Sequence, residues 1–485
     1  MQCILEIADE VNVRIKGLDL DTRRQLVNKY KFDIPGARYL PAVRLGRWDG
    51  KVSFFQLSGS TYIHLLTEIL PWLAEQGYDI ELDDTRSYRT KFDLQEVHEA
   101  SFSHVMWPKG HPKEGQPVEL RDYQVEIINR FLENPQCLQE IATGAGKTII
   151  TAALSHAISD YGRSIVIVPN KSLVTQTEKD YVNMGLDVGV FFGDRKEFGR
   201  RHTICTWQSL NVLLKNTKNH EAEITIHEFL EDVVCVIVDE VHMAKADALK
   251  TLLTGVMSQV PIRWGLTGTI PKEKYEAMSI SCCLGNVMGK LSASELQEQG
   301  VLAQCHVNIV QLMDHVEYTN YQSELKYLLE SKERIDYIGE MIKRIADSGN
   351  TLILVDRVAA GQALTERIQD AVFVSGATKA AERQDEYDDV ATSSRKVIVA
   401  TYGVAAVGIN IPRIFNLVLI EPGKSFVRVI QSIGRGVRKA EDKDFVQIWD
   451  ITSTCKFAKR HLTQRKTFYK EAKYPFTIEK VDYKT

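Results

Sequence analysis

From Val118 onward, short apolar runs rich in β-branched residues alternate with stretches of helical periodicity. The runs are continuous rather than alternately polar, as a parallel strand covered on both faces requires. Such runs separated by helices predict an α/β fold with parallel sheets. The predicted strands are Ser164–Val168, Thr203–Thr206, Val233–Val238, Arg263–Leu266, Val307–Gln311, Thr351–Val355, Ala371–Val374, Val397–Ala400, Leu417–Ile420 and Phe445–Trp449.

The rhythm of strands and helices stutters once, around Leu291–Leu302, which predicts two successive α/β domains with a boundary near residue 303. At about 150 residues per domain, a chain of 485 residues has room for a third. The first 95 residues contain four short strand patterns and two helical ones, enough for a small α+β domain. We therefore expect an α+β domain at 1–95, a Pro- and Gly-containing linker at 96–117, α/β domains at 118–302 and 303–455, and a basic tail at 456–485. The N-terminal patterns are strands at Ile4–Ile7, Val11–Ile15, Lys51–Gln56 and Tyr78–Leu82, and helices at Asp21–Tyr30 and Tyr62–Gln76.

The composition excludes several classes of protein. Lys and Arg total 60 against 64 Asp and Glu, a net charge of −4, which excludes a uniformly basic nucleic-acid packer but allows a local basic face. No apolar run approaches the roughly 20 residues that cross a bilayer, and the N-terminus is acidic where a signal peptide is basic. The eight cysteines include no Cys-x-x-Cys pair, which favours reduced thiols over a zinc site. We expect a cytoplasmic monomer that binds neither membrane nor zinc.

A glycine-containing loop, Ala142-Thr143-Gly144-Ala145-Gly146-Lys147-Thr148, runs directly into a helical pattern. Loop amides and a helix N-terminus together bind phosphate, and Lys147 would bring a positive charge to the β- and γ-phosphates of ATP. The Thr148 hydroxyl would hold Mg²⁺. The full phosphate-loop pattern has Gly where this chain has Ile141, so the motif alone also fits a glycine-rich turn before a helix.

A second motif, at 239–242, favours a phosphate-binding loop over a simple glycine-rich turn at 142–148. The predicted strand Val233–Val238 ends in Asp239-Glu240-Val241-His242, and carboxylates at the end of a parallel strand lie where α/β proteins bind ligands. Asp239 suits Mg²⁺ coordination through water, and Glu240 suits activation of the attacking water as a general base. The alternative is a pair of surface acids.

The sequence Val238-Asp239-Glu240-Val241-His242 resembles motif II of the superfamily 2 helicases, whose motor is a pair of RecA-like domains with ATP in the cleft between them. The resemblance implies that His242 lies at the nucleotide, that Gln124 reads the adenine edge with Arg121 beside it, and that motif III links hydrolysis to strand movement through Thr267 and Thr269. In chain order the first domain matches the Q-motif at Leu120–Gln124, motif Ia at Ile165–Gln176, motif Ib at Thr206–Ser209 and motif III at Gly265–Thr269.

The resemblance continues in the second domain. There it implies that Gly408, Asn410 and Gln431 lie around the nucleotide, although many relatives have Asp where this chain has Asn410, so hydrogen bonding replaces an acid role there. Arg435 and Arg438 are three residues apart, on one face of a helix, and Arg438 matches the usual arginine finger. A finger from a second domain would make hydrolysis conditional on closure. The matches are motif IV at Thr351–Arg357, motif V at Thr401–Asn410 and motif VI at Gln431–Arg438.

The N-terminal residues Arg38–Pro41 and Gly46–Lys51 resemble the accessory domain of the UvsW-type branch-migration helicases of tailed bacteriophages. That family remodels branched DNA such as Holliday junctions and forks, so the resemblance implies a branched DNA partner and a role in recombination, repair or replication. By the motor resemblance, residues that contact the DNA backbone are Lys171, Thr206, Gln208, Arg357 and Thr401. Contacts to phosphates read no sequence, so we expect recognition of DNA structure rather than of sequence.

Two segments have a local positive charge that the net charge hides. Between Lys29 and Lys51, six basic residues face two acids and are interleaved with four aromatics (Tyr30, Phe32, Tyr39 and Trp48). Basic groups bind phosphate and aromatic rings stack on unpaired bases. Arg47 and Trp48, in a turn-like Gly-Arg-Trp-Asp-Gly context, are the preferred candidates, although any of the aromatics can equally be core. The last 30 residues carry nine Lys and Arg against three acids, which fits either a basic tail that follows duplex DNA or only a solvated helix.

Three other functions stay open. The motor motifs alone do not separate a DNA helicase from an RNA helicase. The motor subunit of a restriction-type complex should come with a nuclease, for which the residues after the second motor domain leave little room. A nucleotide-gated binding module without catalysis requires a damaged site, yet Lys147, Asp239, Glu240 and Arg438 are all present.

Overall fold

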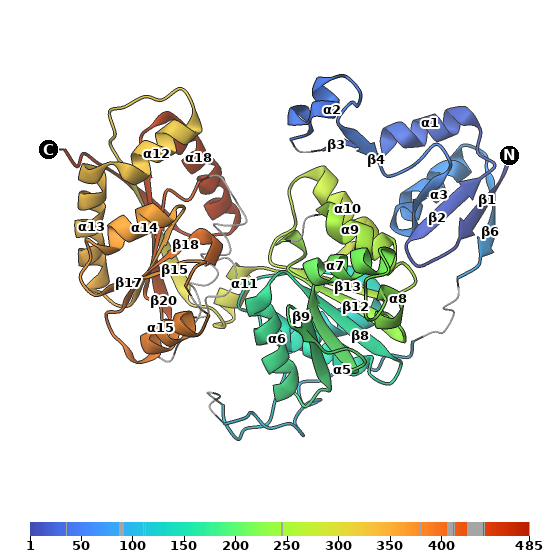
Figure 1. Ribbon diagram of the computed structural model, residues 1–485, viewed down its shortest axis with the longest axis horizontal. Helices are drawn as coiled ribbons and strands as arrows, with labels where there is room; N and C mark the ends of the chain where they lie inside the picture. The colour runs from blue at the N-terminus through green and yellow to red at the C-terminus, as the bar shows by residue number, and fades with distance from the viewer. Residues whose placement is uncertain are drawn as a thin grey trace. The chain divides into compact units, whose positions relative to one another are not determined.

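The computed structural model describes residues 1–34, 36–86, 92–109, 111, 113–243, 246–378, 380–404, 411, 413–423, 440 and 442–484. The chain forms two compact units, the first comprising Met1–Ile141 and Gly146–Lys290, the second Ala142–Ala145 and Leu291–Thr485. Both units contain parallel sheets covered by helices (Figure 1), which confirms the predicted α/β class. The predicted domain ranges within this division stay a prediction.

The first 84 residues contain a four-stranded sheet with strand order β5-β2-β1-β6 and a separate antiparallel pair of strands, β3 and β4. Strand β1 pairs antiparallel with β2 and parallel with β6. Alternate residues of β1 point into the core, and this alternation is what the sequence pattern predicts for a sheet with one covered face. The elements are β1 (Gln2–Ile7), β2 (Asn12–Lys16), α1 (Leu20–Lys29), β3 (Lys31–Asp33), η1 (Ala37–Tyr39), α2 (Pro41–Arg44), β4 (Lys51–Ser53), β5 (Ser60–Tyr62), η2 (Ile63–Leu65), α3 (Leu66–Glu75) and β6 (Asp79–Asp84).

An eight-stranded sheet forms the rest of the first unit, with strand order β10-β9-β11-β8-β12-β13-β7-β14. Every residue of β12 is buried, which explains its uninterrupted apolar sequence. The elements are α4 (Asp122–Glu133), β7 (Gln136–Ile141), α5 (Lys147–Ala157), β8 (Arg163–Val168), α6 (Lys171–Asn183), β9 (Val188–Phe192), β10 (Arg195–Lys196), β11 (His202–Thr206), α7 (Trp207–Lys218), α8 (Ile226–Phe229), β12 (Val233–Asp239), η3 (Val241–Met243), α9 (Ala246–Thr254), β13 (Ile262–Thr267), α10 (Lys274–Leu284) and β14 (Val287–Leu291).

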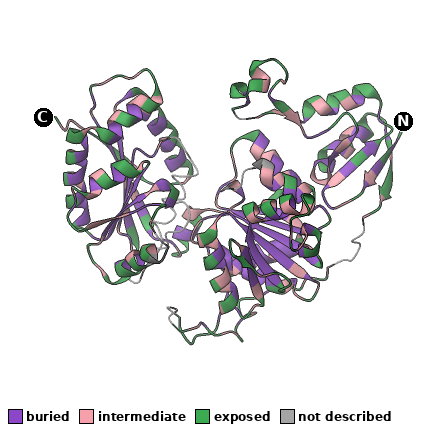
Figure 2. Cartoon of the chain, in the orientation of Figure 1, coloured by how far each residue is buried: buried purple, intermediate pink, exposed green. Residues whose placement is uncertain are grey.

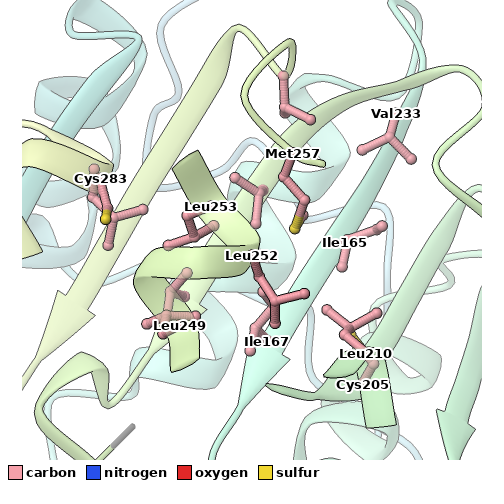
Figure 3. Packing of buried hydrophobic residues seen from close by; sticks show 14 of the residues in the cluster. Ile165, Ile167, Cys205, Leu210, Val233, Leu249, Leu252, Leu253, Met257 and Cys283 are labelled. Carbon is pink, nitrogen blue, oxygen red and sulfur yellow. The ribbon is translucent and has the colours of Figure 1, made fainter. Parts of the chain in front are cut away.

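Helix α9 covers one face of this sheet. Its residues Leu249, Leu252 and Leu253 belong to the same buried cluster as Ile165 and Ile167 of β8 (Figure 3). All of these side chains are less than 5% exposed, so the cluster holds the sheet and its covering helices in a fixed arrangement.

The N-terminal sheet shares a core with helix α10. Tyr275 and Cys282 of α10 pack in one buried cluster with residues of β1, β2 and α3. The rings of Phe54 and Tyr275 lie 5.8 Å apart, and the Asn12 side chain donates a hydrogen bond of 2.9 Å to the Thr254 carbonyl. The N-terminal sheet and α10 therefore share one buried core. Figure 2 shows buried residues both in the N-terminal sheet and in the larger sheet of the first unit.

The second unit contains a seven-stranded sheet with strand order β17-β18-β16-β19-β20-β15-β21, parallel throughout. It includes all six strands predicted for this part of the chain. The elements are α11 (Ala293–Glu298), β15 (Gln304–Leu312), α12 (Tyr321–Glu330), α13 (Lys332–Ala346), β16 (Thr351–Val355), α14 (Val358–Thr365), β17 (Ala371–Val374), α15 (Ala380–Thr392), β18 (Val397–Thr401), β19 (Asn416–Ile420), β20 (Phe445–Ser453), α18 (Lys456–Glu471) and β21 (Phe476–Val481).

Of the two interpretations of 456–485, the structure supports a solvated helix rather than a free basic tail. Residues in this segment form α18 and β21, and β21 pairs parallel with β15 at the edge of the second sheet. Helix α18 buries Leu462, Phe468 and Tyr469 on one side and leaves most of its lysines exposed on the other. The positive charge is therefore the solvent face of an amphipathic helix.

A buried charge network lies at one end of the second sheet. Arg334 is fully buried and forms ion pairs of 3.2 Å with Asp314 and 2.6 Å with Glu421. Arg465 of α18 pairs with Asp450 at 2.8 Å and donates a hydrogen bond to the Gly423 carbonyl. These contacts fix Glu421–Gly423 just before the residues that carry the motif VI match.

His202 gives the first unit a pH-dependent stability. It is 1% exposed between Ser159 and Ser164, and burial lowers its pKa from 6.5 to about 4. Because the folded state then binds its proton less readily than the unfolded state, this stability is complete above pH 6.5 and is lost as the pH falls to about 4. We expect a loss of about 3 kcal/mol over that window. Urea unfolding of His202→Asn should show a flatter pH dependence than wild type, whereas His98→Asn, at an exposed position, should match wild type.

All eight cysteines are buried as free thiols. Across the described part of the chain, no helix has both the length and the apolar character needed to span a bilayer.

Candidate functional site

The predicted phosphate loop joins the end of β7 to the start of α5. Gly144 and Gly146 have φ values of 94° and 81°, a left-handed conformation that favours glycine. A Cβ at Gly146 would lie 2.6 Å from Nε2 of Gln124, so a side chain there would require Gln124 to move. Among the described residues no side chain caps α5, which leaves its first N–H groups for an anion. Thr143, Gly144 and Ala145 belong to the second compact unit and Gly146 to the first.

Lys147 and Glu240 form an ion pair. The Lys147 Nζ lies 2.7 Å from Glu240 Oε1, and the two side chains are 9% and 14% exposed. Glu240 itself has a φ of 49°, a left-handed conformation that turns the chain immediately after β12. Burial opposes ionisation of Glu240, but the Lys147 ammonium and His242 outweigh it and hold the pKa below its ordinary value. Lys147, the predicted phosphate-binding cation, thus neutralises Glu240, the predicted general base.

Asp239 is a buried carboxylate at the end of β12. It is 4% exposed, and burial together with the neighbouring Glu240 raises its pKa. Within the described residues no basic side chain pairs with it, and its carboxylate accepts a hydrogen bond from its neighbour's backbone N–H at 2.8 Å. A buried carboxylate that forms no ion pair with any described residue suits a Mg²⁺ ligand.

Strand register brings the motifs together. In the sheet, β12 neighbours β13, and β13 neighbours β7. Asp239 is paired with Leu266, and Thr267 with Glu140, so the predicted motifs II and III and the strand leading to the phosphate loop end at the same edge. This is the carboxyl edge at which parallel sheets bind ligands.

His242 connects motif II to motif III. The Thr267 hydroxyl donates to the Thr269 carbonyl at 2.9 Å, so its oxygen accepts the 2.6 Å hydrogen bond from His242 Nδ1. Burial lowers the pKa of His242, which favours the neutral ring. The Thr269 hydroxyl is buried without a hydrogen-bond partner among the described residues. The Glu240 carboxylate lies 3.5 Å from the same ring nitrogen. His242 is therefore close to both Glu240 of motif II and Thr267 of motif III.

Thr148 has a contact that the sequence did not indicate. Its hydroxyl donates a hydrogen bond to Oδ2 of Asp180 in α6. Burial raises the pKa of Asp180, and the Thr148 hydrogen bond opposes that rise. Asp180 is 32 residues away from Thr148 and belongs to no motif, so only the packing of α6 on α5 could reveal it.

The Q-motif residues lie at the start of α4. Gln124 is 5% exposed, and its Oε1 accepts a 3.0 Å hydrogen bond from the backbone N–H of Arg121, which caps the helix. The Arg121 guanidinium donates to the Tyr123 hydroxyl at 3.0 Å. A Cβ at Gly146 would meet the Gln124 side chain, so Gln124 lies beside the phosphate loop.

Three predicted DNA-contacting residues line one groove. Lys171, Thr206 and Gln208 border a groove of about 590 Å³ at the carboxyl ends of β8 and β11. Helices α6 and α7 both begin here, capped by Asn170 and Thr206. Two helix N-termini with an exposed lysine suit the phosphates of a nucleic-acid backbone.

Other predicted residues lie in the second unit. Arg357 follows β16 and Thr401 ends β18, and the register pairs Val355 with Thr401, so both lie at one edge of the second sheet. Arg357 contacts Glu330 at 3.7 Å. Outside the described residues lie Gly408, Asn410, Gln431, Arg435 and Arg438.

The N-terminal aromatics divide between core and surface. Tyr30 is 2% exposed and belongs to the core, and the Phe32 ring packs on Phe54 at 5.7 Å. Trp48 is half-buried, with its indole N–H donating to the Lys51 carbonyl at 2.9 Å. Tyr39, by contrast, is 60% exposed.

The basic residues around these aromatics also divide. Lys31 and Lys51 pair with Asp49 and Asp33 at 2.6 Å and 3.5 Å. Arg44 and Arg47 are exposed and form no ion pair with any described residue. Residues 37–48, here called the basic lobe, therefore present unpaired arginines beside exposed apolar side chains, a combination that suits phosphates and bases.

Comparison with known proteins identifies related sequences. Residues 117–272 match the family described as Type III restriction enzyme, res subunit, and residues 333–440 match the helicase conserved C-terminal domain. The ATP-dependent DNA helicase uvsW of Enterobacteria phage T4 is 24% identical over 465 residues, covering 91% of this chain and 89% of that protein. The DNA 3′-5′ helicase XPB of Kineococcus radiotolerans is 24% identical over 379 residues, covering 75% of this chain and 65% of that protein.

Solved structures share the fold. The ATP-dependent Type ISP restriction-modification enzyme LlaBIII bound to DNA matches with a TM-score of 0.57 and 16% identity, covering 86% of this chain and 36% of that chain. At that identity the match supports the fold alone.

Proposed function

We propose that the chain, which matches two helicase family models and resembles the UvsW-type superfamily 2 helicases, is an ATP-dependent DNA helicase that unwinds or branch-migrates junctions and forks. The observation that carries the enzymatic part is the meeting of Lys147, Asp239 and Glu240 at one sheet edge. These side chains supply a cation for phosphate, a ligand for Mg²⁺ and a base for water.

The ion pair between Lys147 and Glu240 suggests how nucleotide binding prepares hydrolysis. Phosphate oxygens compete with Glu240 for the Lys147 ammonium, and when Lys147 moves to phosphate the Glu240 carboxylate loses the neighbour that lowers its pKa. Its basicity then rises toward the range a general base needs. Bound Mg²⁺, held by Thr148 and Asp239, would neutralise charge on the β- and γ-phosphates.

The link between hydrolysis and DNA is part of the proposal. His242 bonds Thr267 and lies beside Glu240, so a change at Glu240 reaches motif III through one side chain. On the resemblance of motif VI, Arg438, with Arg435 beside it, would complete the site from the second RecA-like domain, making hydrolysis depend on domain closure.

Two features support DNA, and branched DNA, as the partner. The groove beside Lys171, Thr206 and Gln208 suits a phosphate backbone without reading bases. The similarity to the phage DNA helicase extends over 91% of this chain, so it includes N-terminal residues outside the motor. The basic lobe is where we place contact with unpaired bases at a branch point. Because the relative is a phage protein, the proposal also includes that this chain acts in the cytoplasm of a host cell.

ATP hydrolysis and strand separation on four-way junction, fork, linear duplex and single-stranded RNA test the substrate. The proposal expects the largest stimulation and unwinding with the junction or fork. Stronger stimulation by RNA would favour an RNA helicase. Hydrolysis with movement along duplex but no strand separation would favour the motor of a restriction-type complex, a candidate suggested by the match of residues 117–272.

The basic lobe gives a sharper expectation. Trp48→Ala and Tyr39→Ala should each spare ATP hydrolysis without DNA and lower junction unwinding by about 5- to 150-fold, since loss of one base-stacking contact costs about 1–3 kcal/mol. Because Tyr39 is 60% exposed, its replacement should leave folding unaffected. Tyr62→Phe on the same domain is the control. If Trp48→Ala unfolds the N-terminal sheet, Trp48 is core; if Tyr39→Ala also unwinds junctions normally, the basic lobe does not contact the branch point.

A further inference from the structure

We propose that Asp180 is a positioning residue for Thr148, holding its hydroxyl in the orientation that coordinates Mg²⁺. This inference rests on the nucleotide site proposed above. Thr148 is the second residue of α5 and is 8% exposed, and its hydroxyl donates to Oδ2 of Asp180. Among the described residues, Asp180 forms no ion pair with a basic side chain, so the Thr148 hydroxyl is the partner that its carboxylate has.

The place of Asp180 is fixed by its neighbour Tyr181. Tyr181 is fully buried between α5 and α6. Its hydroxyl lies 2.6 Å from the Ser155 hydroxyl and donates to the Thr151 carbonyl at 3.1 Å. Both partners lie on α5, the helix that carries Thr148. Tyr181 therefore holds Asp180 against α5. This is the helix that carries Thr148, whose hydroxyl donates the hydrogen bond to the Asp180 carboxylate.

The hydrogen bond determines what the Thr148 oxygen can do. A threonine hydroxyl in a helix otherwise tends to donate to a backbone carbonyl three or four residues earlier. Donation to Asp180 keeps the proton on the α6 side and leaves the oxygen lone pairs for a cation. Sharing the proton with a carboxylate also makes the oxygen more negative and hence a stronger ligand for a hard cation.

Two properties separate this role from simple packing. A positioning residue for a metal ligand changes affinity for the metal while leaving the fold and the metal-free binding of nucleotide unchanged. Its effect also requires the ligand that it positions, so it disappears when Thr148 has no hydroxyl.

The test measures binding of a fluorescent, non-hydrolysable ATP analogue to the full chain while MgCl₂ is titrated. For Asp180→Asn we expect the Mg²⁺ concentration at half-maximal binding to rise about 10- to 100-fold. Analogue affinity in EDTA and the melting temperature without nucleotide should match wild type. Asp180→Glu, which keeps the carboxylate, should shift less. Glu178→Gln is the matched control, since Glu178 lies on the same helix and pairs with Arg195 instead.

A double-mutant cycle completes the test. Thr148→Val should raise the Mg²⁺ requirement, and Asp180→Asn should add nothing in the Thr148→Val background. An unchanged Mg²⁺ requirement in Asp180→Asn, an additive effect in the double variant, or an equal loss of analogue affinity with and without Mg²⁺ would overturn the role of Asp180. If Thr148→Val shifts the requirement and Asp180→Asn does not, the nucleotide site stands and this inference fails. If the wild-type chain binds no analogue at all, the proposed function itself fails.

Discussion

Replacing Lys147 with alanine is expected to lower ATP hydrolysis by about 10³-fold or more, since it removes a preorganised charge from the developing negative charge on the phosphates. The Lys147 side chain is only 9% exposed, so water replaces its ammonium poorly. The loss should appear both without DNA and with saturating forked DNA, because Lys147 acts on the nucleotide rather than on the DNA groove.

The measurement is steady-state release of phosphate. Lys215→Ala, an exposed lysine of α7, is the control for loss of one positive charge in the same domain and should hydrolyse ATP like wild type. Substantial turnover by Lys147→Ala would remove the phosphate loop from the catalytic site.

Glu240→Gln is expected to keep ATP and hydrolyse it about 10²- to 10⁴-fold more slowly, since glutamine preserves the shape but cannot accept the proton of the attacking water. The structure adds a second expectation. Glutamine carries no charge to hold Lys147, so ATP no longer has to displace an ion pair of 2.7 Å, and ATP affinity should equal or exceed that of wild type.

Two measurements separate these effects: equilibrium binding of the fluorescent analogue, and single-turnover hydrolysis, which isolates the chemical step. Glu126→Gln, an exposed acid of α4, serves as the control. A Glu240→Gln chain that hydrolyses ATP at the wild-type rate would show that another group activates water.

Much of the motor could be predicted from local sequence because its constraints are local. Strand β12 is buried on every residue and so has to be apolar throughout, which makes its position and the carboxylates at its end readable. Lys147 and Glu240 are each identifiable from their motifs. Their direct ion pair is not, because it depends on the register of β12, β13 and β7.

Some strands were not predicted because they contain polar residues whose hydrogen-bond partners lie far away in the sequence. Strand β7 carries the phosphate loop, yet its Gln136, Gln139 and Glu140 break the apolar pattern; Gln139 is 1% exposed and donates to the Ile127 carbonyl. Strand β21 is an edge strand with several exposed residues, so its segment resembled a tail. The contact of Asp180 with Thr148 likewise could not be predicted, because it depends on the packing of α6 on α5.

The central claim is that this chain converts ATP hydrolysis into work on DNA. The most direct measurement follows ATP hydrolysis by the wild-type chain, with Mg²⁺ present, as a DNA fork is titrated in. The account predicts a saturable increase in turnover with strand separation that stops when ATP is omitted. Hydrolysis that is absent, or that does not change at any fork concentration, would contradict it.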